Sequence, residues 1–369
     1  VFVKCQPFWR FSRENKDAMF VSFAPFKTNS MIGWLQNLDD NARRITLNQA
    51  SLNSEITSKA IEKDWWVTLV LKMLFASKYA PYFAFKGGTS LSKGWGIIDR
   101  FSEDIDIALN SEAFGMPYKD KPSKTFVEQL RREGCLFTSN EIATELLAQF
   151  EKLQIPVELF SIEVEAVRKD MPDTDPQTIY VNYKSLFEPN PYLPDRVKIE
   201  FSVRSQREPK EKREMQTLLN NYFPNDIFGE HSFEVPTISP RITYIEKILL
   251  LHEAYNREDE RTQRTSRMSR HYYDLYRINK KNSNTLSDIS FIEDIIEHRK
   301  LYSRLRHFDY STLCIGQISI IPAETILMKL KSDYDEMAKE MMYCDVPTFA
   351  EIVDVVRTIQ DSFNQKLLY

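Results

Sequence analysis

Apolar residues recur at helical spacing over long stretches of this chain, and they alternate with polar residues in its middle part. The helical spacing predicts helices over residues 54–79, 126–150, 242–255, 269–279, 289–305, 323–342 and 349–368. The alternation predicts strands over residues 157–167, 178–183 and 196–203. We therefore expect an α/β (α+β) fold, in which a mixed sheet flanked by helices is followed by a C-terminal helical domain.

The change from alternating to helical pattern falls near Pro236 and Pro240. This predicts three parts: an N-terminal extension with a leading helix over residues 1–53, an α/β domain over 54–235 and a helical domain over 236–369. The first thirty residues are rich in aromatic side chains and lack clear periodicity. They are either an irregular segment or an arm that packs on the body of the protein.

Glycine is concentrated in one short segment. Residues 85–109 read FKGGTSLSKGWGIIDRFSEDIDIAL and contain four of the nine glycines of the chain. The pattern predicts a strand over 82–85, a glycine turn, a short helix over 89–93 and a second strand over 97–109. A strand, a glycine turn and a helix N-terminus together favour anion binding, because unpaired backbone N–H groups point outward there.

Two aspartates follow this turn. Asp104 and Asp106 alternate with Ile105 and Ile107, so both carboxylates share one face of the expected strand. Neighbouring carboxylates repel each other, and a divalent cation bound by hard oxygen ligands relieves that repulsion. A pair of solvated or salt-bridged strand residues is the alternative.

A third carboxylate is expected from another strand. Glu200 is the only acid within residues 196–203, and it shares a face with Lys198 and Ser202. It is the natural candidate to complete a site for two metal ions with Asp104 and Asp106. The alternative is a glutamate that faces solvent on an edge strand.

The polar residues of the turn do not form a P-loop. A Walker motif needs glycine, lysine and then serine or threonine, but the chain has Ser92-Lys93-Gly94. Lys86 and Lys93 either contact phosphate or are solvated. Thr89 and Ser90 either donate their hydroxyls to phosphate or cap the short helix. The backbone of the turn is the stronger candidate for phosphate contact.

Beyond residue 236, Lys247 lies in an amphipathic helix, where solvation is the simplest interpretation. Asp274 follows an arginine-rich stretch, and an ion pair with Arg270 four residues earlier is the plain interpretation of its position. The repeated arginines suit contact with phosphates and bases, and a solvated or disordered basic loop is equally consistent with their spacing. They are Arg257, Arg261, Arg264, Arg267 and Arg270.

The composition excludes several classes of protein. The net charge of −4 gives no global attraction to nucleic acid or to anionic membranes, so such binding must come from local patches. Four scattered cysteines without a CxxC pair argue against a structural zinc site and for a reducing compartment. No apolar run approaches the roughly 20 residues needed to span a bilayer. We therefore expect a soluble cytoplasmic protein with no membrane partner.

These motifs resemble a known family. The glycine turn followed by Asp104-Ile105-Asp106 resembles the signature of the DNA polymerase β-like nucleotidyltransferase superfamily. More narrowly, four blocks are similar to the AbiEii/AbiGii nucleotidyltransferase toxins, and the likeness covers about residues 60–280. The blocks are KGGTSL at 86–91, RFSEDID at 100–106, Glu246-Lys247 and RHYYDL at 270–275.

The resemblance implies an NTP-dependent, Mg²⁺-dependent nucleotidyltransferase with a polymerase β-like core. It also implies the toxin of a type IV toxin–antitoxin or phage abortive-infection pair, with a cognate antitoxin and with tRNA or other RNA as acceptor. The implied nucleotide-binding residues are Lys86, Gly87, Gly88, Thr89, Ser90, Ser102 and Lys247. The implied catalytic residues are Asp104, Asp106, Glu200, Lys247 and Asp274, and the first three of these would bind two Mg²⁺ ions.

Two other functions remain open from the sequence. The first is a nucleotidyl- or phosphotransferase that acts on a small molecule or a protein. The second is a nucleotide-binding module without catalytic activity.

Overall fold

The computed structural model describes residues 32–54, 56–167, 174–205, 208–223, 228–257, 265–281, 286–303, 305, 308–343 and 346–365. Its centre is a seven-stranded mixed sheet with the strand order β3-β4-β5-β2-β1-β7-β6. The strands are β1 (Phe83–Lys86), β2 (Ile105–Leu109), β3 (Phe160–Val164), β4 (Gln177–Tyr183), β5 (Arg196–Ser202), β6 (Lys210–Met215) and β7 (Phe233–Ile238). The α/β class and the mixed sheet expected from the sequence are confirmed.

The sheet contains both parallel and antiparallel strand pairs. β1 pairs antiparallel with β2 and parallel with β7, whereas β2 pairs parallel with β5. The outer pairs β3–β4, β4–β5 and β6–β7 are antiparallel. The three central strands β1, β2 and β5 each place a charged side chain at the middle of one face, and these side chains form the site described below.

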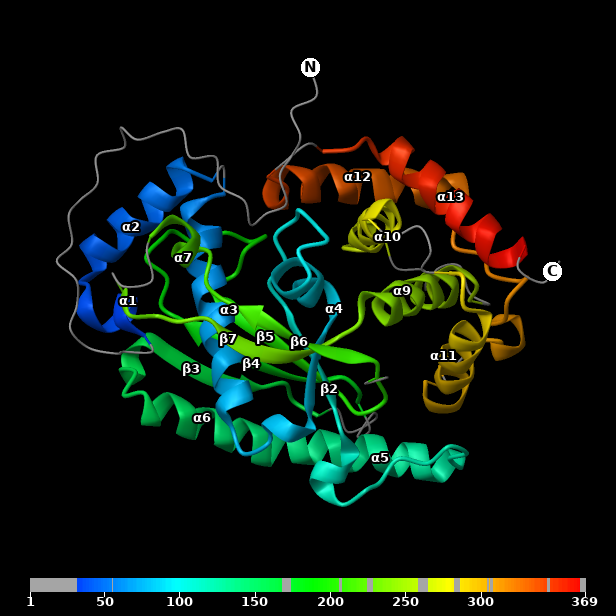
Figure 1. Ribbon diagram of the computed structural model, residues 1–369, viewed down its shortest axis with the longest axis horizontal. Coiled ribbons are helices and arrows are strands. Elements are labelled where there is room, and N and C mark those ends of the chain that lie inside the picture. The colour runs from blue at the N-terminus through cyan, green and yellow to red at the C-terminus, as the bar shows by residue number, and fades with distance from the viewer. Residues whose placement is uncertain are drawn as a thin grey trace.

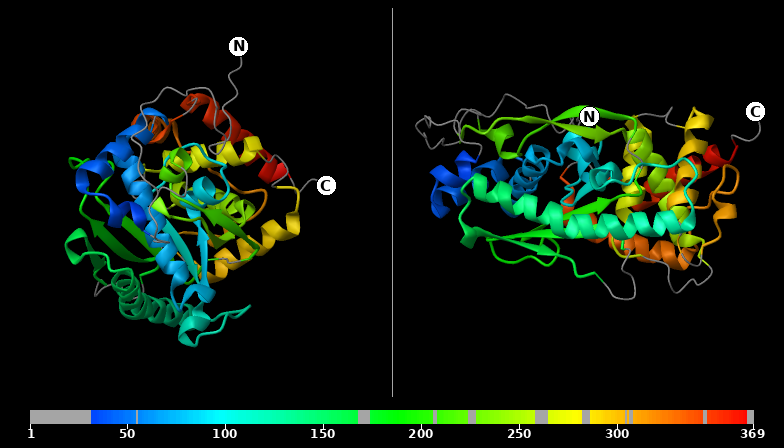
Figure 2. Two further views of the ribbon diagram at one scale, coloured as in Figure 1. Left: turned by 60° about the vertical axis from the view of Figure 1, so that its left-hand side comes forward. Right: turned by 90° about the horizontal axis from the view of Figure 1, so that it is seen from below.

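The opposite face of the sheet is apolar and covered by helices (Figures 1 and 2). Phe83 of β1 lies beside Phe201 of β5, with ring centroids 5.7 Å apart, and Phe75 of α3 (Ser58–Ala76) packs edge-on against Phe83. α6 (Ala143–Lys152) covers the outer strands, where Phe150 stacks on Phe160 of β3 at 4.2 Å. α5 (Lys124–Phe137) leads into α6 through a helical segment, Thr138–Ile142.

Most long helices begin at a residue whose side chain caps the first turn. Thr57 accepts a hydrogen bond from the backbone N–H of Ala60 at the start of α3, and Ser123 does the same at α5. Ser239 caps α9 (Pro240–Tyr255), and Pro240 occupies the first helical position, where a missing N–H costs nothing. These caps explain why the expected helices begin close to the predicted residues.

The remaining helices lie at the two ends of the sheet. α1 (Gly33–Asn37), α2 (Asp40–Leu52) and the short α7 (Leu219–Tyr222) lie at one end, whereas the C-terminal helices gather at the other (Figure 1). The C-terminal helices are α9, α10 (Ser269–Lys281), α11 (Ile289–Tyr302), α12 (Glu324–Met341) and α13 (Phe349–Gln365), which confirms the five predicted from the sequence. None of the described helices is both long and apolar enough to cross a membrane.

The sheet and the C-terminal helices share one hydrophobic core, which runs from Ile32 to Phe363. The expected boundary at residue 236 falls inside β7, and the helical part starts at Pro240. The division into three domains therefore stays a prediction, and the expectation for the first thirty residues lies outside the described part of the chain.

Two strands were not predicted. β6 is an edge strand with the sequence KEKREM, and its run of charged residues shows no alternation of apolar and polar positions. Charged residues are nevertheless typical of sheet edges, where they prevent pairing with other chains. β7 contains Pro236, which argues against a strand in sequence-based reasoning. Their pairing is long-range, because Lys210 lies opposite Ile238.

The second strand is shorter than predicted. We expected it to start at Ile97, but β2 starts at Ile105, and residues 97–104 form a loop. The loop is held by tertiary contacts, since the backbone N–H of Phe101 donates to the carbonyl of Met341 at 2.7 Å. Met341 ends α12, so the C-terminal helices fix the segment that precedes the two aspartates.

A buried carboxyl group joins α1 to α3. Glu230 is 4% exposed and accepts hydrogen bonds from the backbone N–H of Trp34 and the indole N–H of Trp65, both at 3.0 Å. Burial outweighs these bonds and the charge of Lys72, and it raises the pKa of Glu230 to about 7.

The raised pKa predicts a pH-dependent stability. The folded protein keeps the proton on Glu230 up to about pH 7, whereas the unfolded chain loses it near its ordinary pKa of 4.5. This group's contribution is therefore fully present below pH 4.5 and is lost as the pH rises to 7, by up to about 3 kcal/mol. Urea denaturation at pH 5 and pH 8 should show a smaller loss for Glu230→Gln than for the wild type. Equal losses in both proteins would contradict the assignment.

Candidate active site

A row of charged side chains crosses the middle of the sheet. The register places Lys86 of β1 opposite Asp106 of β2, and Asp106 opposite Glu200 of β5. Directly opposite residues on neighbouring strands point to the same face. The sheet thus brings together two carboxylates that are 94 positions apart in the sequence, as the sequence analysis expected for a shared site.

Asp106 is surrounded by negative charge. Burial, followed by the charges of Glu200 and Asp104, raises its pKa to about 7, and Lys86 and Arg270 only partly oppose this. The raised pKa of Asp106 indicates that negative charge is crowded at this point of the sheet. A bound cation would relieve it and would restore the ionised carboxylate.

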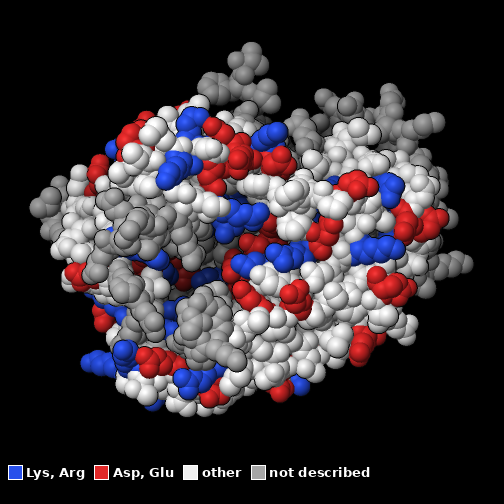
Figure 3. Space-filling view, turned by 180° about the vertical axis from the view of Figure 1, so that it is seen from behind, with Lys and Arg blue, Asp and Glu red and all other residues white. Residues whose placement is uncertain are grey.

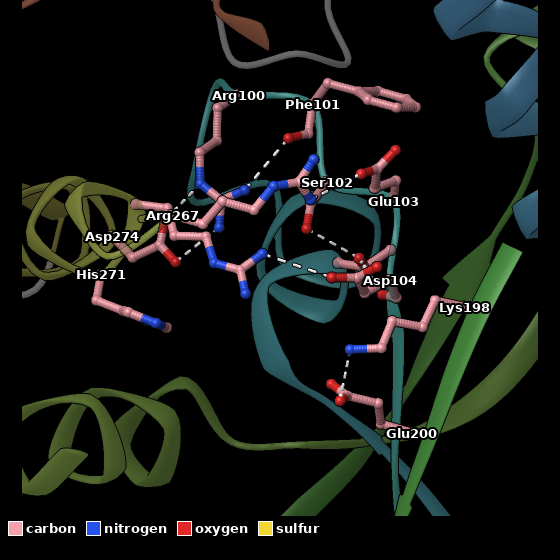
Figure 4. Close-up of polar contacts among 12 residues, drawn as sticks. Arg100, Phe101, Ser102, Glu103, Asp104, Lys198, Glu200, Arg267, His271 and Asp274 are labelled. Atoms are coloured by element: carbon pink, nitrogen blue, oxygen red, sulfur yellow. Dashed lines mark hydrogen bonds and ion pairs between the residues drawn. The ribbon is translucent and has the colours of Figure 1, made fainter. Parts of the chain in front are cut away.

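Nearby cations hold the other two carboxylates. Lys198 Nζ lies 2.7 Å from Glu200 Oε1 (Figure 4). Arg270 Nη1 lies 3.5 Å from Asp104 Oδ2. Within the described ranges, no three His, Cys, Asp or Glu side chains are arranged to hold a metal ion as they stand. The donor chemistry fits Mg²⁺, which prefers carboxylate oxygens, but binding requires these two ion pairs to open.

The glycine turn is dictated by close approach of the site residues. Gly87 has a φ of +74°, and a Cβ there would lie 1.9 Å from Asp106 Oδ2. A Cβ on Gly88 would lie 2.7 Å from Arg100 Nη2 and 3.0 Å from Ser102 Oγ. Only glycine therefore lets the turn, α4 (Gly87–Thr89), pass between the carboxylates and the loop over residues 97–104.

The hydroxyl groups of the turn point inward. Thr89 is fully buried, and its Oγ1 bonds with Ser102 Oγ at 2.9 Å and donates to the carbonyl of Asp104. Ser90 is also buried and donates to the carbonyl of Gly87 at 2.8 Å. Both hydroxyls therefore position the turn and the start of β2. Contact of these residues with a nucleotide stays a prediction.

The two lysines of the turn have different surroundings. Lys93 is buried and pairs with Asp64 of α3 at 2.5 Å, away from the carboxylates. Lys86 lies beside Asp106 and pairs with Glu246 of α9 at 2.8 Å, and it also donates to Ser205 at 2.9 Å. Of the two, Lys86 is the one that lines the site.

A buried carboxylate joins the site to the C-terminal helices. Asp274 of α10 has no exposed surface, and Arg100 binds it through Nε and Nη2, both at 2.8 Å (Figure 4). Lys247 of α9 approaches the same carboxylate at 2.9 Å and His271 Nδ1 at 3.2 Å. Burial opposes ionisation of Asp274, but Arg100 and Lys247 outweigh it and hold its pKa well below its usual range.

This arrangement differs from the ion pair with Arg270 considered from the sequence. Asp274 pairs with Arg100 and Lys247, whereas Arg270 reaches Asp104. Arg100 is a residue of the candidate site that the sequence analysis did not single out. A signal was present, since it begins the RFSEDID block, and a buried arginine needs a carboxylate partner.

The site opens into a cleft of about 540 Å³, which we call the main cleft. Its walls carry the glycine turn, the three carboxylates, Lys247 and three arginines of the predicted cluster, Arg257, Arg267 and Arg270. Arg267 reaches Glu103 at 3.3 Å and the carbonyl of Tyr192 at 3.2 Å. Arg261 and Arg264 lie outside the described residues. The volume suits a ligand of nucleotide size.

Comparison with known proteins identifies the family. Residues 69–355 match the model of the family described as nucleotidyl transferase AbiEii toxin, type IV TA system. The chain belongs to this family. Among curated proteins, no sequence matches the chain. Among solved structures, MenT4, a nucleotidyltransferase toxin from Mycobacterium tuberculosis H37Rv, has a TM-score of 0.38 and 17% sequence identity, over 80% of this chain and 89% of that one.

Membership of the AbiEii family makes this chain a nucleotidyltransferase of the toxin class. The match also corrects the extent of the resemblance. We expected it to end near residue 280, with the last ninety residues outside it, but it continues to residue 355, within α13. The contact between Phe101 and Met341 gives a physical reason, since the C-terminal helices hold the loop before β2.

Asp274 provides a test that separates positioning from direct catalysis. Asp274→Ala should lower the free energy of unfolding by about 3–5 kcal/mol, because it leaves Arg100 and Lys247 buried without their partner. Urea denaturation measures this loss, and Asp361→Asn on the exposed surface of α13 serves as a control with little expected effect. Unchanged stability with abolished nucleotide transfer would instead show that Asp274 acts directly on the substrate.

Proposed function

We propose that this chain transfers a nucleotide from an NTP to the 3′ end of an RNA such as tRNA, using Mg²⁺ held by Asp104, Asp106 and Glu200. The observation that carries the proposal is the register that sets Asp106 directly beside Glu200, with Asp104 immediately before the same strand. The raised pKa of Asp106 supports it, because crowded negative charge is what a divalent cation stabilises.

The protein side chains would have distinct roles. Bound Mg²⁺, in two ions, would neutralise charge on the α-phosphate and lower the pKa of the attacking hydroxyl. We call Asp106 and Glu200 the carboxylate row. Lys86 of β1 lies beside this row and partly compensates its charge, and Glu246 fixes the position of the Lys86 ammonium group. Lys198 and Arg270, which pair with Glu200 and Asp104, would contact phosphate oxygens once these ion pairs open.

The triphosphate is assigned to the side of the main cleft that carries Arg267 and Arg270. Arg270 is 35% exposed, and its only ion pair among the described residues is the 3.5 Å contact with Asp104, so its charge is available to a phosphate. Arginine donors suit phosphate because their planar fork matches its oxygens. The backbone of the turn at Gly87 and Gly88 lines the same cleft.

The RNA acceptor is proposed from local charge alone. Among the residues that the structure describes, Lys and Arg are interspersed with Asp and Glu over the face seen in Figure 3, so these residues form no broad basic surface there. Of the cluster arginines that line the main cleft, Arg257 is not assigned to the triphosphate, and it would contact the RNA backbone.

In the cell, we propose that the protein is the toxin of a type IV toxin–antitoxin or phage abortive-infection system in the cytoplasm, with a cognate antitoxin as partner. The description of the matched family supports this assignment. A gene for a small DNA-binding protein directly upstream would further support it.

The central prediction concerns the carboxylate row. With Mg²⁺, labelled NTPs and total tRNA, the wild type should transfer label, and Asp106→Asn and Glu200→Gln should each lower the rate about 100-fold or more. Calorimetric titration with Mg²⁺ alone should lose its binding signal in the same variants. Glu163→Gln, on β3 of the same sheet and exposed, is the matched control.

Two outcomes would overturn this assignment. The first is equal transfer by wild type and Asp106→Asn. The second is transfer of label only to a protein or a small molecule, which would replace RNA as the acceptor.

A further prediction concerns the phosphate side of the main cleft. Arg270→Ala should raise the KM for NTP about 10-fold, because one charge-assisted phosphate contact is lost. Lys280→Ala removes a charge from the exposed end of the same helix α10 and should leave the KM unchanged. Steady-state kinetics at fixed Mg²⁺ and acceptor measure both. An unchanged KM in Arg270→Ala would place the triphosphate elsewhere.

A further inference from the structure

A second cavity of about 220 Å³ adjoins the main cleft at the carboxylate row. Both cavities are lined by Lys86, Asp106 and Glu200. Only the second cavity is lined by Ser202, Arg204, Ser205, Ile295, His298 and Ser303. The carboxylates therefore form the shared wall between two spaces of different size.

The two cavities lie at successive positions along the central strands. β2 and β5 run parallel, so residue numbers increase in the same direction on both. Asp104 and Lys198 line only the main cleft, whereas Ile107 and Ser202 line only the second cavity. A ligand that spans both cavities must pass over Asp106 and Glu200.

The chemistry of nucleotide transfer gives this geometry a meaning, and this step rests on the proposed function. In a phosphoryl-type transfer the attacking and leaving oxygens lie roughly in line, on opposite sides of the phosphorus atom. If the leaving pyrophosphate lies toward Arg267 and Arg270, the acceptor hydroxyl must approach from the opposite side of the carboxylates. That side is the second cavity.

The two arginines that line the second cavity each have a carboxylate in contact, and one of them, Arg299, lines the main cleft as well. Arg204 is bound by Asp175 at 2.5 Å, and Arg299 is bound by Glu253 through two contacts of 2.6 and 2.9 Å. Burial lowers the pKa of His298 to about 4, so its ring is neutral at pH 7. The cations of the second cavity are thus compensated, whereas Arg270 of the main cleft has only a 3.5 Å partner.

A cavity with paired charges, a neutral imidazole and hydroxyl groups suits a planar polar group without charge. Unstacked bases at RNA ends are bound in this way, through aromatic rings, guanidinium planes and hydrogen bonds to their edges. Pockets that hold whole drug-sized ligands have volumes of about 300–1,000 Å³. The second cavity is smaller, so it fits one base better than a complete nucleotide. His298 is itself fixed, because its ring stacks on Tyr302 at 4.8 Å.

We propose that the second cavity holds the base of the terminal nucleotide of the acceptor RNA, so that its 3′ hydroxyl lies over Asp106 and Glu200. His298 and Ser303 are then specificity-determining residues for the acceptor and do not contact the NTP.

The test compares acceptors with and without a terminal base. Short single-stranded oligoribonucleotides that end in adenosine, cytidine, guanosine or uridine are compared with one whose last nucleotide is abasic, at saturating NTP and Mg²⁺. Wild-type kcat/KM for the preferred acceptor should exceed that for the abasic one by about 10-fold, as expected for loss of one stacked base. In His298→Ala this ratio should fall to about 2-fold, with the KM for NTP unchanged.

Two further variants keep the test decisive. Ser303→Leu narrows the second cavity without touching an ion pair, and it should raise the KM for the acceptor even if His298→Ala folds poorly. Arg270→Ala is the matched control from the main cleft. It should raise the KM for NTP and keep the full 10-fold ratio between the intact and the abasic acceptor.

The outcomes separate this inference from the proposed function. If RNA is labelled but the abasic ratio stays at 10-fold in His298→Ala and Ser303→Leu, the base binds elsewhere and the inference is wrong. If the two variants raise the KM for NTP instead, the second cavity holds the base of the NTP. If the wild type labels no RNA at all, the proposed function itself fails.

Discussion

The placement of the C-terminal helices over the carboxylates of the sheet depends on one buried ion cluster. Asp274 on α10 binds Arg100 from the loop before β2 and Lys247 from α9, and no part of its carboxylate reaches solvent. A buried charge is tolerated only when its partners are fixed, so the cluster holds the three segments in a defined arrangement. The cluster thereby also sets the distance between the carboxylates of the sheet and Arg270 of α10.

The same helix is also held at its N-terminus. Asp333 of α12 accepts hydrogen bonds from the backbone N–H groups of Arg267 and Ser269, at 2.5 and 3.0 Å, and from the hydroxyl of Ser269 at 2.6 Å. α12 also contacts the loop before β2 through Met341. The C-terminal helices therefore do more than cover the core, because they position both walls of the main cleft. This agrees with a family match that extends to residue 355.

Charge compensation divides the site into regions with different chemistry. The carboxylate row at Asp106 and Glu200 carries excess negative charge, and the α10 side of the main cleft carries Arg270, whose partner Asp104 lies 3.5 Å away. The second cavity shares Asp106 and Glu200, but its arginines, Arg204 and Arg299, each have a carboxylate in contact. This separation suits the proposed transfer from a charged donor to the less charged end of an acceptor. In enzymes, preorganised charges and dipoles that stabilise the transition state usually make the largest single contribution to catalysis.

The sequence by itself determined the local features. The glycine pair, the alternation from Ile105 to Ile107 and the period of the C-terminal helices all follow from short-range rules, and each appears in the structure, although Asp104 lies just before the strand. The alternation in residues 196–203 also placed Glu200 on the polar face of β5. Local pattern failed for β6 and β7, because their charged residues and Pro236 contradict strand propensity and only long-range pairing stabilises them.

Only the tertiary structure decided which of these features form one site. The parallel register of β2 and β5 joins Asp106 to Glu200, and no local pattern carries that information. The fold also assigned partners that spacing had misassigned, since Asp274 binds Arg100 across 174 positions and leaves Arg270 to Asp104. The physical reason is burial: a carboxylate removed from water takes the cations that the packing of distant segments brings to it.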